Sequence, residues 1–376
     1  MVEKWIIFGC GSKANGFLKL YNLIEYNRET CIVAFVDNNP QLWGGDFHGY
    51  PIVSPADILS INADYICIWS SFCEEIKKQL ITDLGVPEYK VKNIFYKYLE
   101  DCKYTNHTEN LSEGEIRKQK EFLNQLMKSY GISVYGYKPA QEHKLHEVYY
   151  DEIADLNWVE FEGKKMYLKR GYELIYKEGK AYVSDFWKEQ DDNSPHKYCD
   201  ERVFVKEGDV LLDGGTCEGN FTLHNIDKIK KAYIVECNPD WVEALQYTFA
   251  PYKDKVVICN RYLSDVDSES QISIDSLVKE ELNFLKLDIE GAERKALQGG
   301  KNSIQKSRDF RCSICTYHRT GDEEYVTDFL NDCGVTGVPS EGYMLFLHDP
   351  EIKEKPQLRR GVVRGIKKDN TFNKII

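Results

Sequence analysis

Short apolar runs alternate with helical segments in the first hundred residues. The runs at 5–8, 32–36 and 65–69 are strand-like, and the apolar residues of 17–26 recur every three or four positions. Alternation of this kind is typical of parallel strands joined by crossover helices. It predicts a Rossmann-like α/β domain over residues 1–100, of the type that binds nucleotides or sugar nucleotides.

The pattern changes in the next hundred residues. Residues 101–145 are polar, with apolar positions spaced by three and four, which predicts a helical linker with a solvated charged face. Residues 146–205 contain short alternating segments separated by glycine turns, which predict an antiparallel β lead-in. Its aromatic residues are expected to pack the sheet or, alternatively, to form a substrate wall.

A short helix is expected at the end of this lead-in. Ser194 is a favourable N-cap, and Pro195 suits the first helical position. The helix would bring His196 and Tyr198 to the loop that follows, so both are candidate substrate contacts. A packing or solvent role is the alternative for His196.

Strand-like runs alternate with helical segments again in residues 206–350. The earlier runs have the spacing of parallel strands, and two later ones, at 335–340 and 342–349, can form a closing antiparallel pair. The pattern predicts a seven-stranded, mostly parallel sheet whose last strand is antiparallel. In such α/β sheets, ligands bind beyond the carboxyl ends of the strands.

The stretch LLDGGTCEGNFTL, residues 211–223, has the pattern of a strand, a tight turn and a helix start. Backbone N–H groups and the positive end of the helix dipole then point into the loop. Asn220 and Phe221 stand where a triphosphate-binding loop needs Lys and Ser or Thr, which disfavours ATP hydrolysis. The candidate cofactor-binding residues of this loop are Asp213, Gly214, Gly215, Glu218 and Gly219.

Acidic residues end two adjacent strands, at Asp213 and Glu236. Carboxylates repel a diphosphate but suit a ligand that carries an ammonium and a sulfonium. A carboxylate in the position of Glu236 can also accept both hydroxyls of a ribose. This pattern predicts S-adenosylmethionine rather than NAD, with Ser264 and Asp265 after the third strand as candidate contacts to adenine.

The fourth and fifth strands end in residues suited to catalysis. His318 is the first candidate for a general base, because its unperturbed pKa lies near neutrality. Asp288 is the second candidate, although acids at a helix start also act as ordinary caps. Glu290, Tyr317 and Arg319 are candidate substrate contacts.

These segments carry a family resemblance. Residues of about 206–350 resemble FkbM-family methyltransferases through LLDGGTCEGNFTL, YIVECNP, ISIDSL, FLKLDIEGAERKALQGG and TYHRTGDEEYVTDFL. The family pattern K-D-E-G-A-E is written here as Lys286, Asp288, Glu290, Gly291, Ala292 and Glu293. In the first loop, Thr216 replaces the customary alanine. The resemblance implies a class I methyltransferase-like Rossmann domain that uses S-adenosylmethionine to methylate hydroxyls of sugars or natural products.

A divalent cation is a second candidate cofactor. Asp288, with Glu290 or Asp265, offers oxygen ligands for an ion that acidifies the acceptor hydroxyl. Cys312 and Cys315 form a CxxC, but in a strand-like run these positions face opposite sides, and the sequence has no second CxxC. The spacing therefore does not predict zinc, and no metal ligand is assigned.

The first domain has a glycine-rich turn of its own. Gly9, Gly11 and Gly16, with Asp37 after the second strand, resemble a dinucleotide fingerprint that has two extra residues. The altered spacing weakens the prediction of NAD and leaves a phosphate or sugar-nucleotide site, or an ordinary βαβ turn. Residues 35–58 resemble the N-terminal Rossmann-like domain of sugar-modifying acyltransferases of surface-glycan pathways.

The predicted activity is S-adenosylmethionine-dependent O-methylation of a sugar, a surface-glycan precursor or a related metabolite, within polysaccharide biosynthesis. One alternative is a nicotinamide-dependent enzyme that modifies sugar nucleotides with the N-terminal domain. The other is a non-catalytic scaffold that retains the adenosyl pocket.

Charge and composition limit the partners and the compartment. A net charge of −12 disfavours nucleic acid, and scattered cysteines with no leader or long apolar stretch predict a cytoplasmic protein. Residues 351–376 form a predicted basic tail that can contact anionic lipid, or that is simply solvated. Its basic residues are Lys353, Lys355, Arg359, Arg360, Arg364, Lys367, Lys368 and Lys374.

Overall fold

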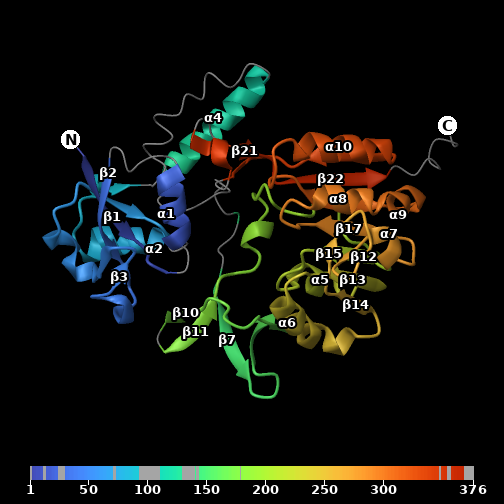
Figure 1. Cartoon of the computed structure of the whole chain (residues 1–376), viewed down its shortest axis with the longest axis horizontal. Coiled ribbons are helices and arrows are strands. Elements are labelled where there is room, and N and C mark those ends of the chain that lie inside the picture. The colour runs from blue at the N-terminus through green and yellow to red at the C-terminus, as the bar shows by residue number, and fades with distance from the viewer. Residues whose placement is uncertain are drawn as a thin grey trace. The chain divides into compact units, whose positions relative to one another are not determined.

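The chain forms two compact units (Figure 1). The computed structural model describes residues 2–11, 14–23, 30–70, 73–92, 111–128, 140, 144–177, 179–346, 349–353 and 357–367. The first unit consists of Met1–Tyr137 with Tyr343–Arg359, and the second of Lys138–Gly342 with Arg360–Ile376. No helix among the described residues is long and apolar enough to cross a bilayer.

The first unit is built on a six-stranded sheet with the order β3-β4-β2-β1-β5-β6, parallel except between β3 and β4. Its strands are β1 (Glu3–Phe8), β2 (Thr30–Val36), β3 (Asp46–Phe47), β4 (Tyr50–Val53), β5 (Tyr65–Ile68) and β6 (Val91–Lys92). A separate antiparallel pair joins β20 (Met344–Leu345) and β21 (Leu358–Arg359). The helical elements are α1 (Ala14–Leu23), η2 (Pro40–Leu42), η3 (Pro55–Ser60), α2 (Cys73–Lys78), η4 (Gln79–Asp83), η5 (Glu88–Lys90), α4 (Glu113–Lys128) and η9 (Pro350–Lys353).

Apolar residues on both faces of β1 explain why this sheet is covered on both sides. Trp5 and Ile7 belong to one buried cluster, and Ile6 and Phe8 belong to another. The first cluster also takes in α4, whose Leu126 is 1% exposed. The prediction of a linker is therefore wrong for α4, because its apolar face packs into the core of the first unit.

The second unit begins with the antiparallel sheet that the glycine turns predict, in the order β10-β11-β7-β8-β9. Its strands are β7 (His146–Asp151), β8 (Leu156–Phe161), β9 (Lys164–Tyr167), β10 (Ile175–Lys177) and β11 (Lys180–Val183), followed by η7 (Lys188–Gln190). The prediction of a helix at Ser194 is wrong, because the chain forms only a reverse turn there, in which the Ser194 Oγ accepts the His196 amide at 3.2 Å. The turn does not continue into a helix. The Tyr198 carbonyl instead accepts a hydrogen bond from the Ser313 hydroxyl at 2.7 Å.

The main sheet has seven strands in the order β14-β13-β12-β17-β18-β22-β19, and β22 runs antiparallel to the other six. This confirms the predicted fold class. The strands are β12 (Val210–Gly214), β13 (Lys231–Val235), β14 (Val256–Cys259), β17 (Phe284–Leu287), β18 (Arg311–Cys315), β19 (Val335–Pro339) and β22 (Val362–Lys367), with a small parallel pair of β15 (Tyr262–Leu263) and β16 (Gln271–Ile272). The helices are α5 (Asn220–Asn225), α6 (Pro239–Phe249), η8 (Ala250–Tyr252), α7 (Ile274–Leu277), α8 (Glu293–Gln298), α9 (Lys301–Lys306) and α10 (Asp322–Asp332).

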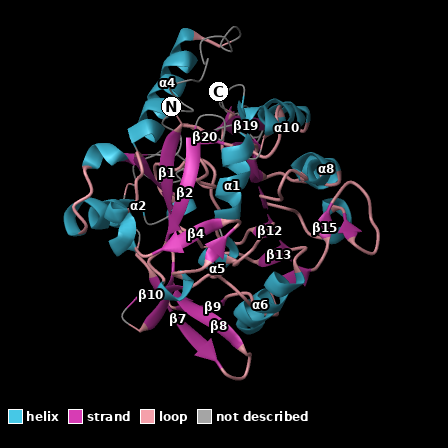
Figure 2. Cartoon of the chain, turned by 60° about the vertical axis from the view of Figure 1, so that its left-hand side comes forward, coloured by secondary structure: helices cyan, strands magenta, loops and turns pink. Residues whose placement is uncertain are grey.

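Helices and the lead-in sheet cover the two faces of the main sheet (Figure 2). Buried residues of α7, α8, α9 and α10 pack on one face, and those of α5, α6 and the lead-in sheet pack on the other. Cys312 lies in the first of these cores and Cys315 in the second. This confirms that the two cysteines of the CxxC face opposite sides of β18.

The prediction of a basic tail is wrong for residues 362–367. Val362 and Val363 are fully buried, because β22 inserts between β18 and β19 and closes the sheet. Arg364 donates to the Lys197 carbonyl at 2.6 Å instead of facing solvent.

The predicted seventh strand at 342–349 contributes only the short β20, in the other unit. The tail residues Lys355, Lys368 and Lys374 lie outside the described residues.

Candidate functional site

Glycines allow the loop after β12 to pack against the end of β17. Gly215 has φ of 70°, and a Cβ there would lie 1.7 Å from the Asp288 carbonyl oxygen. At Gly214 a Cβ would come within 2.7 Å of Leu263, and at Gly219 within 2.7 Å of Leu245. The sequence predicts that these three glycines bind the cofactor. In the structure, the close approach is to other parts of the protein, and it brings the loop beside Asp288.

A buried ion pair supports this loop from beneath. The Lys286 Nζ donates to the carbonyls of Gly214 at 3.2 Å and Gly215 at 2.7 Å, and lies 3.2 Å from the Asp213 Oδ1. The Asp213 Oδ2 accepts the Thr222 hydroxyl at 2.7 Å, and Asp213 is fully buried. Burial would lower the pKa of Lys286, but the carboxylates of Asp213 and Asp288 raise it overall. Asp213 therefore contacts protein groups and does not face an open surface.

Glu236 joins the loop to the start of α6. Its Oε2 accepts the Cys217 amide at 3.1 Å, and its Oε1 accepts the Asn238 amide at 2.8 Å. An ionised carboxylate has about four acceptor positions, so two of them suit further donors such as a ribose diol. The structure thus keeps Glu236 chemically suited to its predicted role.

The remaining candidate cofactor residues lie around the same loop. Glu218 accepts the Tyr172 hydroxyl at 3.0 Å, and burial raises the pKa of Glu218. The Tyr172 ring, from the segment after β9, packs edge-on against Trp241 of α6 with centroids 5.7 Å apart. Ser264 is buried after β15 and donates to the exposed Asp265 at 3.1 Å.

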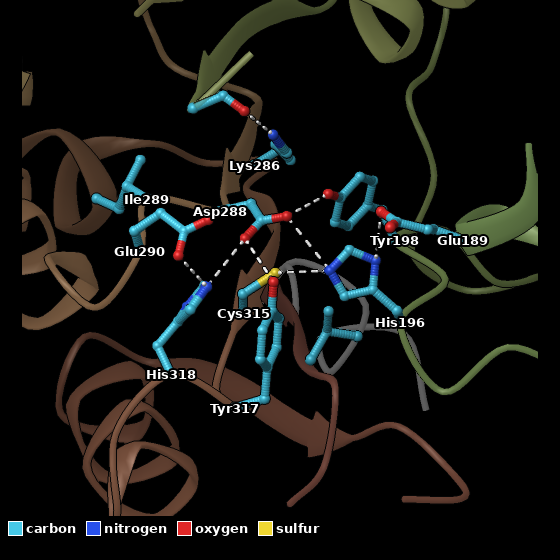
Figure 3. Close-up of polar contacts among 12 residues, drawn as sticks. Glu189, His196, Tyr198, Lys286, Asp288, Ile289, Glu290, Cys315, Tyr317 and His318 are labelled. Atoms are coloured by element: carbon cyan, nitrogen blue, oxygen red, sulfur yellow. Dashed lines mark hydrogen bonds and ion pairs between the residues drawn. The ribbon is translucent and has the colours of Figure 1, made fainter. Parts of the chain in front are cut away.

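Four of the predicted site side chains lie around the Asp288 carboxylate, which follows β17 (Figure 3). The Tyr198 hydroxyl donates to Oδ2 at 2.7 Å, and the His196 Nε2 lies 3.3 Å from the same oxygen. The Tyr317 hydroxyl donates to Oδ1 at 3.3 Å, and the His318 Nε2 lies 3.6 Å from it. The structure therefore brings together five of the predicted site residues from three distant parts of the sequence.

This environment keeps Asp288 ionised. Burial would raise the pKa of its carboxyl, but the hydrogen bond from His196 and the charges on His196, Lys286 and His318 hold it well below its usual range. A carboxylate with so low a pKa is a weak base. Asp288 is thus better suited to positioning its neighbours than to removing a proton.

His318 is held by carboxylates on both sides of its ring. Its Nδ1 lies 3.1 Å from the Glu293 Oε1, and its Nε2 lies 3.6 Å from both Asp288 and Glu290. Burial would lower the pKa of His318, but Glu293, followed by Asp288 and Glu290, raises it overall. Glu293 is fully buried and its Oε1 also accepts the Ile289 amide at 2.9 Å.

Sequence reasoning gave Lys286 and Glu293 no role of their own. Both were noted only as members of the family pattern K-D-E-G-A-E. For Lys286 the available signal was a lysine inside the apolar run FLKL, since a fully buried lysine requires a partner. For Glu293 the signal was an acid at the start of a helix, which also fits an ordinary cap.

A left-handed turn separates β17 from α8. Glu290 has φ of 54° and Gly291 has φ of 91°, and the Glu290 side chain is 91% exposed. A Cβ at position 291 would lie 2.7 Å from the Arg319 Nε, so Arg319 packs against this turn. A positive φ at a non-glycine residue costs free energy and is found at functional turns. The substrate contacts of Glu290 and Arg319 stay predictions.

A cavity of about 330 Å³ lies elsewhere in the second unit. Its lining contains none of the predicted site residues. It is formed by Glu162, Trp187, Gln190, Lys197, Cys199, Phe204, Val205, Phe221, His224, Asn225 and Lys228.

The glycine-rich turn of the first unit is held by its own acid. The Asp37 Oδ2 accepts the Cys10 amide at 2.9 Å, and its Oδ1 accepts the Asn39 amide at 2.8 Å. Gly9 has φ of 119°, and a Cβ there would lie 2.2 Å from the Trp69 carbonyl. These contacts fit the alternative of an ordinary βαβ turn.

Comparisons with known proteins agree with this division of the chain. Residues 263–335 match the methyltransferase FkbM domain, and residues 1–92 match the C2185-like N-terminal family. The crystal structure of methyltransferase FkbM from Methylobacillus flagellatus KT aligns with a TM-score of 0.51 at 13% identity, covering 97% of this chain and 90% of that one. Methanococcus jannaschii fibrillarin aligns over 61% of this chain and 99% of its own, at 12% identity, with a TM-score of only 0.31. No curated protein sequence matches the chain.

Proposed function

We propose that the second unit transfers a methyl group from S-adenosylmethionine to a hydroxyl of a sugar, a surface-glycan precursor or a related metabolite, because residues 263–335 match the methyltransferase FkbM domain and the fold aligns with a methyltransferase FkbM. The placement of His318 carries this proposal. One ring nitrogen is held by Glu293, and the other faces Asp288 at the carboxyl edge of the sheet, beside the loop after β12. The proposal includes a cytoplasmic location and a role in polysaccharide biosynthesis.

The loop after β12 fits the cofactor by the chemistry of its donor set. Glu236 is fixed by two backbone amides and has acceptor positions left for a ribose diol. Gly214 and Gly215 form the turn, Asp213 supports it from beneath through Lys286, and Glu218, Ser264 and Asp265 surround it. When bound, S-adenosylmethionine supplies an electrophilic methyl group on a sulfonium.

His318 is the proposed general base for the acceptor hydroxyl. His318 would take the hydroxyl proton at Nε2 as the methyl group leaves the sulfonium for the acceptor oxygen and S-adenosylhomocysteine is released, and Glu293 on Nδ1 would stabilise the resulting imidazolium. Asp288 stays ionised and fixes the rings of His196, Tyr198, Tyr317 and His318 around the acceptor position. Alignment of the acceptor oxygen supplies most of the rate, because the reaction is an in-line displacement.

The test is methyl transfer by the purified chain. S-adenosylmethionine labelled in its methyl group is incubated with nucleotide sugars and polysaccharide fragments, and the label in each acceptor is measured. We expect His318→Ala to lower kcat by about 100- to 10,000-fold, the usual contribution of a positioned base. His224→Gln, on α5 and paired with Glu162, is the matched control and should keep full activity.

Calorimetry with S-adenosylhomocysteine and NADH separates this proposal from its alternatives. The proposed function is supported if S-adenosylhomocysteine binds the wild-type chain and His318→Ala equally well and the wild-type chain also transfers the methyl label. Binding without transfer to any acceptor supports the non-catalytic scaffold. Binding of NADH alone would overturn the proposal in favour of the nicotinamide-dependent enzyme.

A further inference from the structure

We infer that the second unit binds a zinc-type metal ion through the His196 Nε2, the Asp288 Oδ2 and the Cys315 Sγ (Figure 3). One ligand atom from each of these three residues lies within 4.8 Å of the other two. The site itself is argued from these three residues. Its role in catalysis rests on the proposed function, because the ion's open coordination position would bind the acceptor hydroxyl.

The two distances from the His196 ring nitrogen match tetrahedral zinc. The His196 Nε2 is 3.3 Å from the Asp288 Oδ2 and 3.5 Å from the Cys315 Sγ. Typical zinc bonds at the tetrahedral angle separate nitrogen from oxygen by about 3.3 Å and nitrogen from sulfur by about 3.6 Å. Both neighbours of the His196 Nε2 therefore lie at the separation that a shared zinc ion requires.

Two ligand-type atoms converge on one ring nitrogen. The carboxylate of Asp288 and the sulfur of Cys315 both approach the Nε2 of His196. A single ion at this point could take a lone pair from the imidazole, the thiolate and the carboxylate together.

The surroundings fix the carboxylate and bury two of the ligands. The other ring nitrogen of His196, Nδ1, faces the Glu189 carboxylate at 3.7 Å, which is longer than a hydrogen bond. The Tyr198 hydroxyl donates to the Asp288 Oδ2 at 2.7 Å and fixes the carboxylate. His196 is 1% exposed and Cys315 is fully buried, so the site excludes water from at least two ligands.

The choice of metal follows from the donors and their charges. Thiolate, imidazole and carboxylate together select zinc over magnesium or calcium, which prefer oxygen alone. A thiolate and a carboxylate supply the two negative charges that balance the ion, and the nearby Lys286 is already paired with Asp213. Since the thiolate is the ligand, the thiol proton passes to solvent as the ion binds.

A second group of ligand-type side chains, Asp288, Glu293 and His318, is a weaker candidate. His318 faces Glu293 with Nδ1 and Asp288 with Nε2, which lie on opposite edges of the ring. One ion cannot bond to both nitrogens, so this group orients the base. The oxygen site expected at Asp288 with Glu290 is also disfavoured, because the Glu290 side chain is 91% exposed.

Such an ion would assist the proposed reaction. Three protein ligands leave a fourth position open, as in catalytic zinc sites. An acceptor hydroxyl bound there becomes more acidic, and its proton can pass to His318, whose Nε2 lies 3.6 Å from the other oxygen of Asp288.

Metal content and cobalt substitution test the site directly. We expect the purified wild-type chain to contain about one zinc ion per molecule by elemental mass spectrometry, and its cobalt form to show thiolate-to-metal charge-transfer absorption. Cys315→Ala and His196→Ala should lose both signals. Cys312→Ala is the matched control, because Cys312 is equally buried on the opposite face of the same strand and should keep both.

The outcomes separate this inference from the proposed function. A wild-type chain that binds neither zinc nor cobalt overturns the inference, as does a folded Cys315→Ala variant that binds as well as Cys312→Ala. Label transfer that resists chelators would remove the metal from the reaction and leave the methyltransferase proposal standing. A zinc site in a chain that transfers label to no acceptor would support the metal site and contradict the methyltransferase proposal.

Discussion

The two units hold their glycine-rich loops in the same way. In the first unit the Asp37 carboxylate accepts the Cys10 amide at 2.9 Å, and in the second the Glu236 carboxylate accepts the Cys217 amide at 3.1 Å. Each acid follows the strand next to the loop. An acid at this position therefore stabilises the loop in both units and does not by itself identify a cofactor site.

The units differ at the end of the strand on the other side of the loop. A Cβ on Gly9 would meet the carbonyl of Trp69, and a Cβ on Gly215 would meet that of Asp288. Trp69 packs in an apolar core, whereas Asp288 carries a charge and contacts two histidines. Both groups of metal-ligand-type side chains found among the described residues include Asp288. The two loops are built alike, and the chemical difference lies in the residue whose carbonyl faces the glycine, which is Trp69 in the first unit and Asp288 in the second.

The largest expected effect comes from adding a Cβ at Gly9 or Gly215, where the glycine lies against a backbone carbonyl. Gly9→Ala and Gly215→Ala should each destabilise their own unit by about 4 kcal/mol or more, because a Cβ would overlap a backbone carbonyl. Denaturant unfolding measures this. Gly208→Ala is the control, since its φ is 80° but its Cβ would meet open space, and it should cost only about 1–2 kcal/mol.

Activity distinguishes the two variants further. Under conditions where both remain folded, Gly215→Ala should abolish methyl transfer because it displaces Asp288, whereas Gly9→Ala should leave transfer intact. Full activity in folded Gly215→Ala would contradict the assigned contact between the loop and Asp288.

The next effect concerns the two acids. Glu236→Gln should weaken the binding of S-adenosylhomocysteine by about 10- to 100-fold, since a charged hydrogen-bonding group is worth roughly 1.5–3 kcal/mol. Asp37→Asn should leave this affinity unchanged. Calorimetry measures both, and an equal loss in the two variants would refute the placement of the cofactor beside Glu236.

The alternation of apolar runs was enough to predict both sheets, because buried parallel strands have a strong local pattern. It failed for β22, whose short run VVRGI lies between basic residues and becomes a strand only through its partners β18 and β19. It predicted the helix α4 but not its role, because the pattern does not show that the apolar face with Leu126 packs into the first unit's core. Both failures concern elements defined by tertiary packing.

Sequence reasoning identified most members of the candidate site but not their arrangement. His318, Asp288 and Tyr198 were named from strand ends and a predicted helix start, and the structure brings them into contact. Cys315 was dismissed because its nearest cysteine faces the other way. Its partner His196 is 119 residues away in sequence, so spacing could not reveal it.

The smallest expected effect concerns Glu293, the carboxylate that contacts the Nδ1 of His318. Glu293→Gln should lower kcat about tenfold, because the amide stabilises the His318 imidazolium less than the carboxylate does. The carboxylate raises the pKa of His318, and the base acts only when neutral, so activity is lost as the pH falls through this pKa. In Glu293→Gln that loss should therefore move to lower pH. Glu280→Gln, which removes a carboxylate paired with Lys231, is the control for a change of charge alone. A lower kcat with an unmoved pH profile would show that Glu293 supports the fold without acting on the base.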